Sequence, residues 1–261
     1  LTDRDKLDVT YVSAVGDDDL SRQMTDFVEG AGITPAFAVI EGASPGVYMI
    51  FLTGGERSFQ YWRSQSAARR LADDLGAIEM AGTGDMLYFS GITLAILAPR
   101  ARGRLLGAIV KARDNGAKIA FDTNLRPALW SSPRVMAGVL TAAASLCDIV
   151  LPTHTDEAPL FGDKSVDDTA DRYLELGVEE VVVKDGAGEA LIATADERVR
   201  IAPPPGAKVV DATGAGDSFN GAYLSARLNG KSLREAATAA HRTAGIVIGH
   251  KGALIDPKLV Q

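Results

Sequence analysis

The sequence predicts an α/β fold with a mostly parallel central sheet and a small antiparallel sheet. Short apolar runs alternate with amphipathic helical patterns, helix ends carry capping residues, and one early segment holds strand-like runs with no helix between them. The apolar runs that we expect to form strands of the central sheet are Val9–Val15, Met86–Ser90, Lys118–Phe121, Asp148–Leu151 and Glu180–Lys184.

The predicted helices have recognisable ends. One apolar stripe after residue 104 stops at Asn115-Gly116, which is a typical helix terminus. Ser132 precedes Pro133, as an N-cap precedes proline in the first helical position. Ser232 and Glu235 have the spacing of a capping box. These signals place helices between the strands and on both faces of the sheet.

The segment from Ile33 to Arg63 departs from this alternation. It contains three strand-like runs separated by glycine- and proline-containing turns: Ala36–Ile40, Val47–Leu52 and Ser58–Trp62. We expect a small antiparallel sheet that acts as a lid or an interface. The predicted organisation is a core of residues 1–32 and 64–261 with a β-sheet lid at residues 33–63.

Composition limits the classes of partner. The chain has 261 residues, 46% hydrophobic and 23% charged, which suits one large domain or a domain with a small appendage. Its net charge is −7 and it has no long basic run, so we expect no nucleic-acid partner. No apolar stretch is long enough to span a membrane. The single cysteine, Cys147, suggests a reducing compartment, and we expect a cytoplasmic protein.

A glycine-rich turn near the C-terminus carries the strongest chemical signal. A short strand at Val209-Val210 leads to Gly214 and Gly216, and a helix follows. Glycines here let backbone N–H groups converge on an anion at a helix start. Asp217 would repel a resident phosphate but suits a base that accepts a proton from an attacking hydroxyl. The alternative is a tight turn in which Asp217 complements the helix dipole.

Two other nucleotide-binding motifs are not found in the sequence. The chain has no G-x-x-x-x-G-K-[ST] phosphate loop. The dinucleotide fingerprint would need glycine or alanine where Phe219 lies, which disfavours a dehydrogenase.

Three further groups of residues have both a chemical and a structural interpretation. Asp122-Thr123-Asn124-Leu125-Arg126 follows a strand, where Arg126 suits a carboxylate or phosphate; the alternative is a polar loop with an Asx turn. Tyr61 and Arg63 share one face of a strand, and Tyr48 lies one strand earlier. They either form a polar binding site or are ordinary exposed side chains of a strand. Lys184 to Gly188 forms a strand end and turn that suits a nucleotide phosphate or a surface lysine.

Together these residues resemble the ribokinase-like (PfkB) family of carbohydrate kinases. The run Asp211-Ala212-Thr213-Gly214-Ala215-Gly216-Asp217 is similar to a signature of that family, with Ala212 where threonine is usual. Other motifs resemble the members that phosphorylate 2-keto-3-deoxygluconate: Tyr61-Trp62-Arg63, Ser66-Ala67-Ala68, Asp122-x-Asn124-x-Arg126 and Leu129-Trp130.

The resemblance implies a three-layer sandwich and transfer of the γ-phosphoryl of ATP to the terminal hydroxyl of a sugar acid. It makes Asp217 the base and the amides of Gly214, Ala215 and Gly216 the anion hole. It implies the following contacts: Tyr48, Tyr61, Arg63, Asn124, Arg126 and Asp217 to the sugar acid; Lys184, Gly186, Gly188, Gly214, Gly216 and His241 to ATP. Mg²⁺ is required, a monovalent cation is a further candidate, and the lid would form a homodimer or a higher homo-oligomer.

Two departures from the family are expected to matter. The family begins with a strand, a Gly-Gly segment that contacts the sugar, and a helix, none of which precedes Leu1 in this sequence. Its magnesium-associated N-x-x-E motif appears as Thr153 to Asp156, so Asp156 or the adjacent Glu157 is the metal candidate, through water. The alternatives are a fructokinase- or ribokinase-type enzyme, or a catalytically silent sugar- or nucleotide-binding protein.

Overall fold

The computed structural model describes residues 7–53, 56–73, 76–81 and 83–260. The chain divides into two compact units. One unit contains Tyr88–Ile92 and the chain from Lys118 onward, and the other contains Asp8–Leu87 and Thr93–Ala117.

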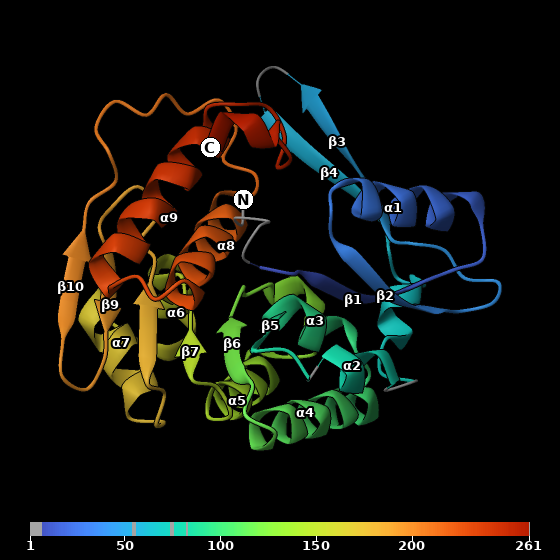
Figure 1. The fold of residues 1–261 in the computed structure, drawn as a ribbon, viewed down its shortest axis with the longest axis horizontal. Coiled ribbons are helices and arrows are strands. Elements are labelled where there is room, and N and C mark those ends of the chain that lie inside the picture. The colour runs from blue at the N-terminus through green and yellow to red at the C-terminus, as the bar shows by residue number, and fades with distance from the viewer. Residues whose placement is uncertain (1–6, 54–55, 74–75, 82, 261) are drawn as a thin grey trace. The chain divides into compact units, whose positions relative to one another are not determined.

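A six-stranded sheet forms the centre of the first unit (Figure 1). Its order is β10-β9-β8-β7-β6-β5, and β6, β7 and β8 pair in parallel, as predicted. β9 and β10 add to one side as antiparallel strands. The strands are β5 (Met86–Ser90), β6 (Lys118–Asp122), β7 (Ile149–Val150), β8 (Glu180–Val183), β9 (Ala190–Ala193) and β10 (Arg198–Ile201).

The helices of this unit begin where the capping residues predict. The side chain of Ser132 accepts a hydrogen bond from Val135 N at the start of α5, and Ser232 and Glu235 form a complete capping box at the start of α9. Helices α8 and α9 pack side by side (Figure 1). The helices are α5 (Pro133–Ala144), α6 (His154–Phe161), α7 (Val166–Leu174), α8 (Ala215–Leu228) and α9 (Leu233–Ile248). The first two residues of α3 (Gly91–Ile96), which follows β5, also belong to this unit.

The core of the first unit is built from the strands that the sequence marks as apolar. All four residues of β8 and of β9 are buried, and Phe89 of β5 stacks on Phe121 of β6 at 4.6 Å between ring centroids. The predicted strand at Val209-Val210 is wrong. The amides of Val210 and Asp211 instead donate to the carbonyl of Ile248, so this segment is tied to the end of α9 and not to a sheet.

The second unit contains a parallel pair of strands and a separate hairpin. β1 (Thr10–Val15) pairs in parallel with β2 (Thr34–Val39), joined by α1 (Asp19–Gly30). β3 (Val47–Thr53) and β4 (Glu56–Trp62) form the antiparallel hairpin. β2 was expected in the antiparallel sheet. It pairs with β1 because an intervening helix is the usual connection between parallel neighbours. The lid boundaries, residues 33–63, stay a prediction.

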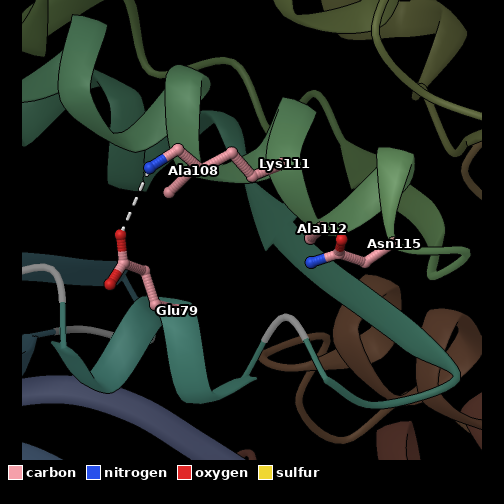
Figure 2. A pocket seen from close by; sticks show the side chains of 5 residues that line it. All are labelled: Glu79, Ala108, Lys111, Ala112 and Asn115. Carbon is pink, nitrogen blue, oxygen red and sulfur yellow. Dashed lines mark hydrogen bonds and ion pairs between the residues drawn. The ribbon is translucent and has the colours of Figure 1, made fainter.

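Two helices of the second unit line an open pocket of about 170 Å³ (Figure 2). It lies between α2 (Gly76–Ala81) and α4 (Pro99–Asp114), where Lys111 Nζ lies 3.4 Å from Glu79 Oε1. The pocket contains no residue that the sequence marks for chemistry. Within the described part of the chain, no helix is both long and apolar enough to cross a membrane.

Candidate active site

The start of α8 is built by Asp211 and Gly214. One carboxylate oxygen of Asp211 accepts from Thr213 N at 2.9 Å, and the other accepts from Gly252 N at 2.9 Å. Gly214 is the N-cap and has φ +77°, a left-handed conformation that favours glycine. No side chain caps this helix, so its first-turn amides keep the capacity to bind an anion.

One of the three amides expected in the anion hole is partly used within the turn. Ala215 N donates to the carbonyl of Ala212 at 3.3 Å, a long bond that leaves it weakly engaged. The first helical bond runs from Ser218 N to the carbonyl of Gly214. Gly216 is exposed, and a Cβ added there would meet no atom within 4 Å, so a ligand has room to approach this turn closely.

Asp217 lies in the first turn of α8, and part of its surface is exposed to solvent. Desolvation by surrounding atoms raises the pKa of its carboxyl, and the negative charge of Asp122 raises it further. The charges of Lys184 and Arg126 oppose this effect and lower the pKa. The net rise makes Asp217 a stronger proton acceptor than an ordinary aspartate.

A polar cluster that the sequence did not reveal lies beside this turn. Lys184 Nζ donates to Asn220 Oδ1 at 3.0 Å and to Asp122 Oδ1 at 3.3 Å. All three side chains are buried, so Lys184 is not the surface lysine of the alternative interpretation. Asn220 Nδ2 in turn donates to the hydroxyl of Tyr88 at 3.3 Å.

Asn124 is held in an unusual backbone conformation. Its φ is +36°, and its amide donates to Ser90 Oγ at 3.0 Å. The loop packs so closely on the turn after β5 that a Cβ on Gly91 would lie 2.0 Å from the carbonyl oxygen of Thr123. These contacts fix the path of the chain into Arg126, which is exposed and donates to its neighbour's carbonyl. Strained backbone of this kind concentrates at functional sites.

The residues predicted to border ATP lie in two different environments, a turn and the buried core. Gly186 and Gly188 form the turn between β8 and β9, where Gly188 N donates to the carbonyl of Asp185 at 2.7 Å. His241 is buried, with Nε2 2.9 Å from the carbonyl oxygen of Ile201 and its ring edge-on to Phe219. These contacts place His241 in the core, and we leave it out of the proposed nucleotide site.

The two metal candidates differ in their exposure to solvent. Glu157 is fully buried, where its Oε2 accepts from Arg172 at 3.0 Å and from Tyr173 at 2.9 Å. A carboxylate held by these donors is a structural group, so Glu157 does not fit the metal role. Asp156 is exposed in the first turn of α6. Among the described residues there is no group of three His, Cys, Asp or Glu placed to hold a metal ion.

Tyr48, Tyr61 and Arg63 lie in the second unit. Tyr48 and Tyr61 are cross-strand partners with ring centroids 6.1 Å apart, and the guanidinium of Arg63 lies 4.2 Å from the centroid of the Tyr61 ring. This places all three on one face of the hairpin, as the two-residue period predicts. Tyr48 also lines a pocket of about 370 Å³ with residues of α1 and the turn before β3.

A parallel α/β sheet, an uncapped glycine-led helix start and a basic carboxylate in its first turn together define a phosphotransferase-type site. The pfkB family carbohydrate kinase model matches residues 4–259. The chain is 40% identical over 257 residues to the 2-dehydro-3-deoxygluconokinase of Escherichia coli strain K12, covering 95% of this chain and 83% of that protein.

Solved structures of other proteins share the fold of this chain. The crystal structure of a PfkB protein from Polaromonas sp. JS666 has a TM-score of 0.79 and 28% identity, covering 95% of this chain and 80% of that one. A putative ribokinase II from E. coli, in complex with ATP and Mg²⁺, has a TM-score of 0.83 and 24% identity, covering 96% and 80%. The chain belongs to the pfkB family of carbohydrate kinases, and the family expected from the motifs is confirmed.

Proposed function

We propose that this kinase transfers the γ-phosphoryl of ATP to the terminal hydroxyl of a sugar acid, with 2-keto-3-deoxygluconate as the substrate and its 6-phosphate as the product. The observation that carries the proposal is the position of Asp217, a carboxylate with a raised pKa in the first turn of an uncapped helix. The 40% identity to a 2-dehydro-3-deoxygluconokinase supports the choice of substrate.

In this proposal Asp217 accepts the proton of the attacking hydroxyl as the bond to phosphorus forms. The amides of the Gly214-Ala215-Gly216 turn bind the charge of the transferring group, which is the principal help that a protein gives to phosphoryl transfer. Gly186 and Gly188 border the nucleotide. Arg126 holds the carboxylate of the sugar acid, and this contact distinguishes an acidic substrate from a neutral sugar.

Asp156 would hold a magnesium ion, through water, next to the phosphates of ATP. Mg²⁺ keeps several waters and needs only one or two protein carboxylates, and the exposed Asp156 is the candidate carboxylate here. When bound, the ion neutralises phosphate charge. A monovalent cation is a further expected ligand. The structure of the putative ribokinase II in complex with ATP and Mg²⁺ supports ATP and Mg²⁺ as cofactors.

Tyr48, Tyr61 and Arg63 are proposed to contact the sugar acid from one face of the β3–β4 hairpin. The opposite face carries exposed apolar side chains, namely Val47, Met49, Phe51 and Trp62. An apolar face of this kind suits a second copy of the chain. We therefore propose a homodimer formed through the hairpin, in a cytoplasmic protein.

A coupled assay of ADP release, run with a panel of sugars and sugar acids, tests the substrate. The proposal predicts the highest kcat/KM with 2-keto-3-deoxygluconate. A preference for fructose or ribose would replace the sugar acid with a neutral sugar. Binding of sugar or ATP without any turnover would identify a silent binding protein.

A further inference from the structure

The ion pair between Lys184 and Asp122 is buried and has no place in the proposed contacts to the sugar acid. Lys184 follows the last residue of β8, and Asp122 ends β6. Their charged atoms lie 3.3 Å apart, and both side chains are nearly inaccessible. A buried charge is costly unless it is paired, so each residue depends on the other for its stability in this position.

The pair is attached to the catalytic helix by Asn220. The amide oxygen of Asn220 accepts from Lys184 at 3.0 Å, and Asn220 follows Asp217 by three residues on α8. Residues three apart lie on neighbouring positions of a helix surface. The ends of two strands are thereby joined to α8 one turn beyond the proposed base, with Tyr88 of β5 as the outermost member through its bond to Asn220.

The charged groups that act on Asp217 come from each of these elements. They are Asp122 at the end of β6, Lys184 at the end of β8 and Arg126 in the loop after β6. Asp217 in turn raises the pKa of the Tyr88 hydroxyl on β5. Asp122 favours the protonated form of Asp217, and the two cations favour the ionised form. The paired charges therefore act on Asp217 in opposite directions.

We propose that the buried Lys184–Asp122 pair, anchored to α8 by Asn220, sets the charge state of Asp217 and acts as a pair of positioning residues for proton transfer. This inference rests on the proposed function, because it needs Asp217 to be the base. It gives Lys184 a role that does not require contact with the nucleotide. With both charges present, the pKa of the Asp217 carboxyl lies above that of an ordinary aspartate.

The test is the pH dependence of kcat/KM in Asp122→Asn, Lys184→Met and the double variant. A base must be ionised to act, so the acidic limb of the profile follows its pKa. Asp122→Asn removes the charge that favours protonation, and its limb moves to lower pH. Lys184→Met removes a charge that favours ionisation, and its limb moves to higher pH. The double variant returns towards the wild-type position.

Lys118→Met is the matched control, because it removes an exposed lysine from the opposite end of β6. The acidic limb of the pH profile of Lys118→Met is expected to stay at the wild-type position. If Lys184→Met fails to fold because Asp122 is left unpaired, Asp122→Asn and the double variant carry the test, and Lys184→Arg restores the cation. Limbs that move in the same direction, or that do not move in any folded variant, overturn the inference.

A second readout separates this inference from the proposed function. The Asp217 carboxyl is titrated directly by ¹³C NMR in the wild type and in each variant, with Asp217→Asn used to assign its signal. Titration midpoints of Asp217 that shift in opposite directions in Asp122→Asn and Lys184→Met support the role of the Lys184–Asp122 pair. Unchanged midpoints overturn it. Normal turnover of Asp217→Asn would instead contradict the proposed function, whatever the titration shows.

Discussion

Gly214 lies directly against Ala253, because a Cβ built on Gly214 would come within 2.9 Å of the Cβ of Ala253. The same glycine has φ +77°, so any side chain there is strained as well as crowded. The turn that begins α8 is thus held against the C-terminal segment by a contact that tolerates no side chain. Asp211 strengthens this attachment through its bond to Gly252 N.

The two glycines of the turn are predicted to fail in different ways when replaced. Gly214→Ala lowers both the melting temperature and kcat, because the turn has to move. Gly216→Ala leaves the melting temperature unchanged, since its Cβ meets nothing within 4 Å, but lowers kcat about tenfold or more because the methyl group blocks close approach of the phosphate. Thermal unfolding and steady-state kinetics measure both effects.

Gly221 provides the control for these variants. It lies inside α8, and a Cβ there also meets nothing within 4 Å. Gly221→Ala is expected to stabilise the protein by about 0.5–1 kcal/mol without loss of kcat. A Gly216→Ala enzyme with normal kcat would contradict the amide site.

Arg126 is predicted to act on substrate binding. Arg126→Ala raises KM for the sugar acid roughly ten- to a hundredfold, the range expected when a charged hydrogen bond is lost, and changes kcat less. Arg134→Ala, at an exposed position in the first turn of α5, is the control and leaves KM unchanged. Equal KM values for wild type and Arg126→Ala would remove Arg126 from the sugar-acid site.

Trp62 tests the proposed homodimer. Its side chain is 54% exposed on the apolar face of the hairpin. Trp62→Glu places a charge on this face and is expected to convert the dimer to a monomer, as measured by light scattering coupled to gel filtration. Val135→Glu, an exposed apolar position on α5, leaves the assembly intact. A Trp62→Glu protein that elutes at the wild-type mass would contradict the hairpin interface.

His241 predicts a pH dependence of stability. Burial lowers the pKa of its imidazole below 6.5, although its contact with the carbonyl of Ile201 acts in the other direction. The folded state therefore resists protonation, so this contribution to stability is fully present above pH 6.5. It decreases as the pH falls below that value and through the lowered pKa. His241→Gln should flatten the fall in melting temperature between about pH 7.5 and 5.5. An equally steep fall in the variant would contradict this account.

The elements with local signals were predictable from the sequence. The capping box of Ser232 and Glu235 depends on residues three apart, and the structure contains it. The glycine turn before Asp217 was visible for the same reason. Val209-Val210 was misjudged because its apolar character suits a strand, while its amide partner at Ile248 lies far along the chain.

Long-range contacts explain what the sequence did not reveal. Lys184 meets Asp122 and Asn220 across 62 and 36 residues, and no periodic pattern marks such a meeting. The parallel pairing of β2 with β1 likewise depends on the whole unit and not on the turn residues that follow β2. Glu157 was assigned by its type, but its partners Arg172 and Tyr173 lie on another helix.

The most direct test of the central claim is the turnover of Asp217→Asn. The amide keeps the size of the side chain but does not accept the proton, so kcat is expected to fall by about 10²–10⁴ while the affinity for ATP is retained. Asp19→Asn, which removes an exposed carboxylate from the first turn of α1, controls for charge at a helix start and keeps full activity. An Asp217→Asn enzyme with wild-type kcat would contradict the role of Asp217 as the base.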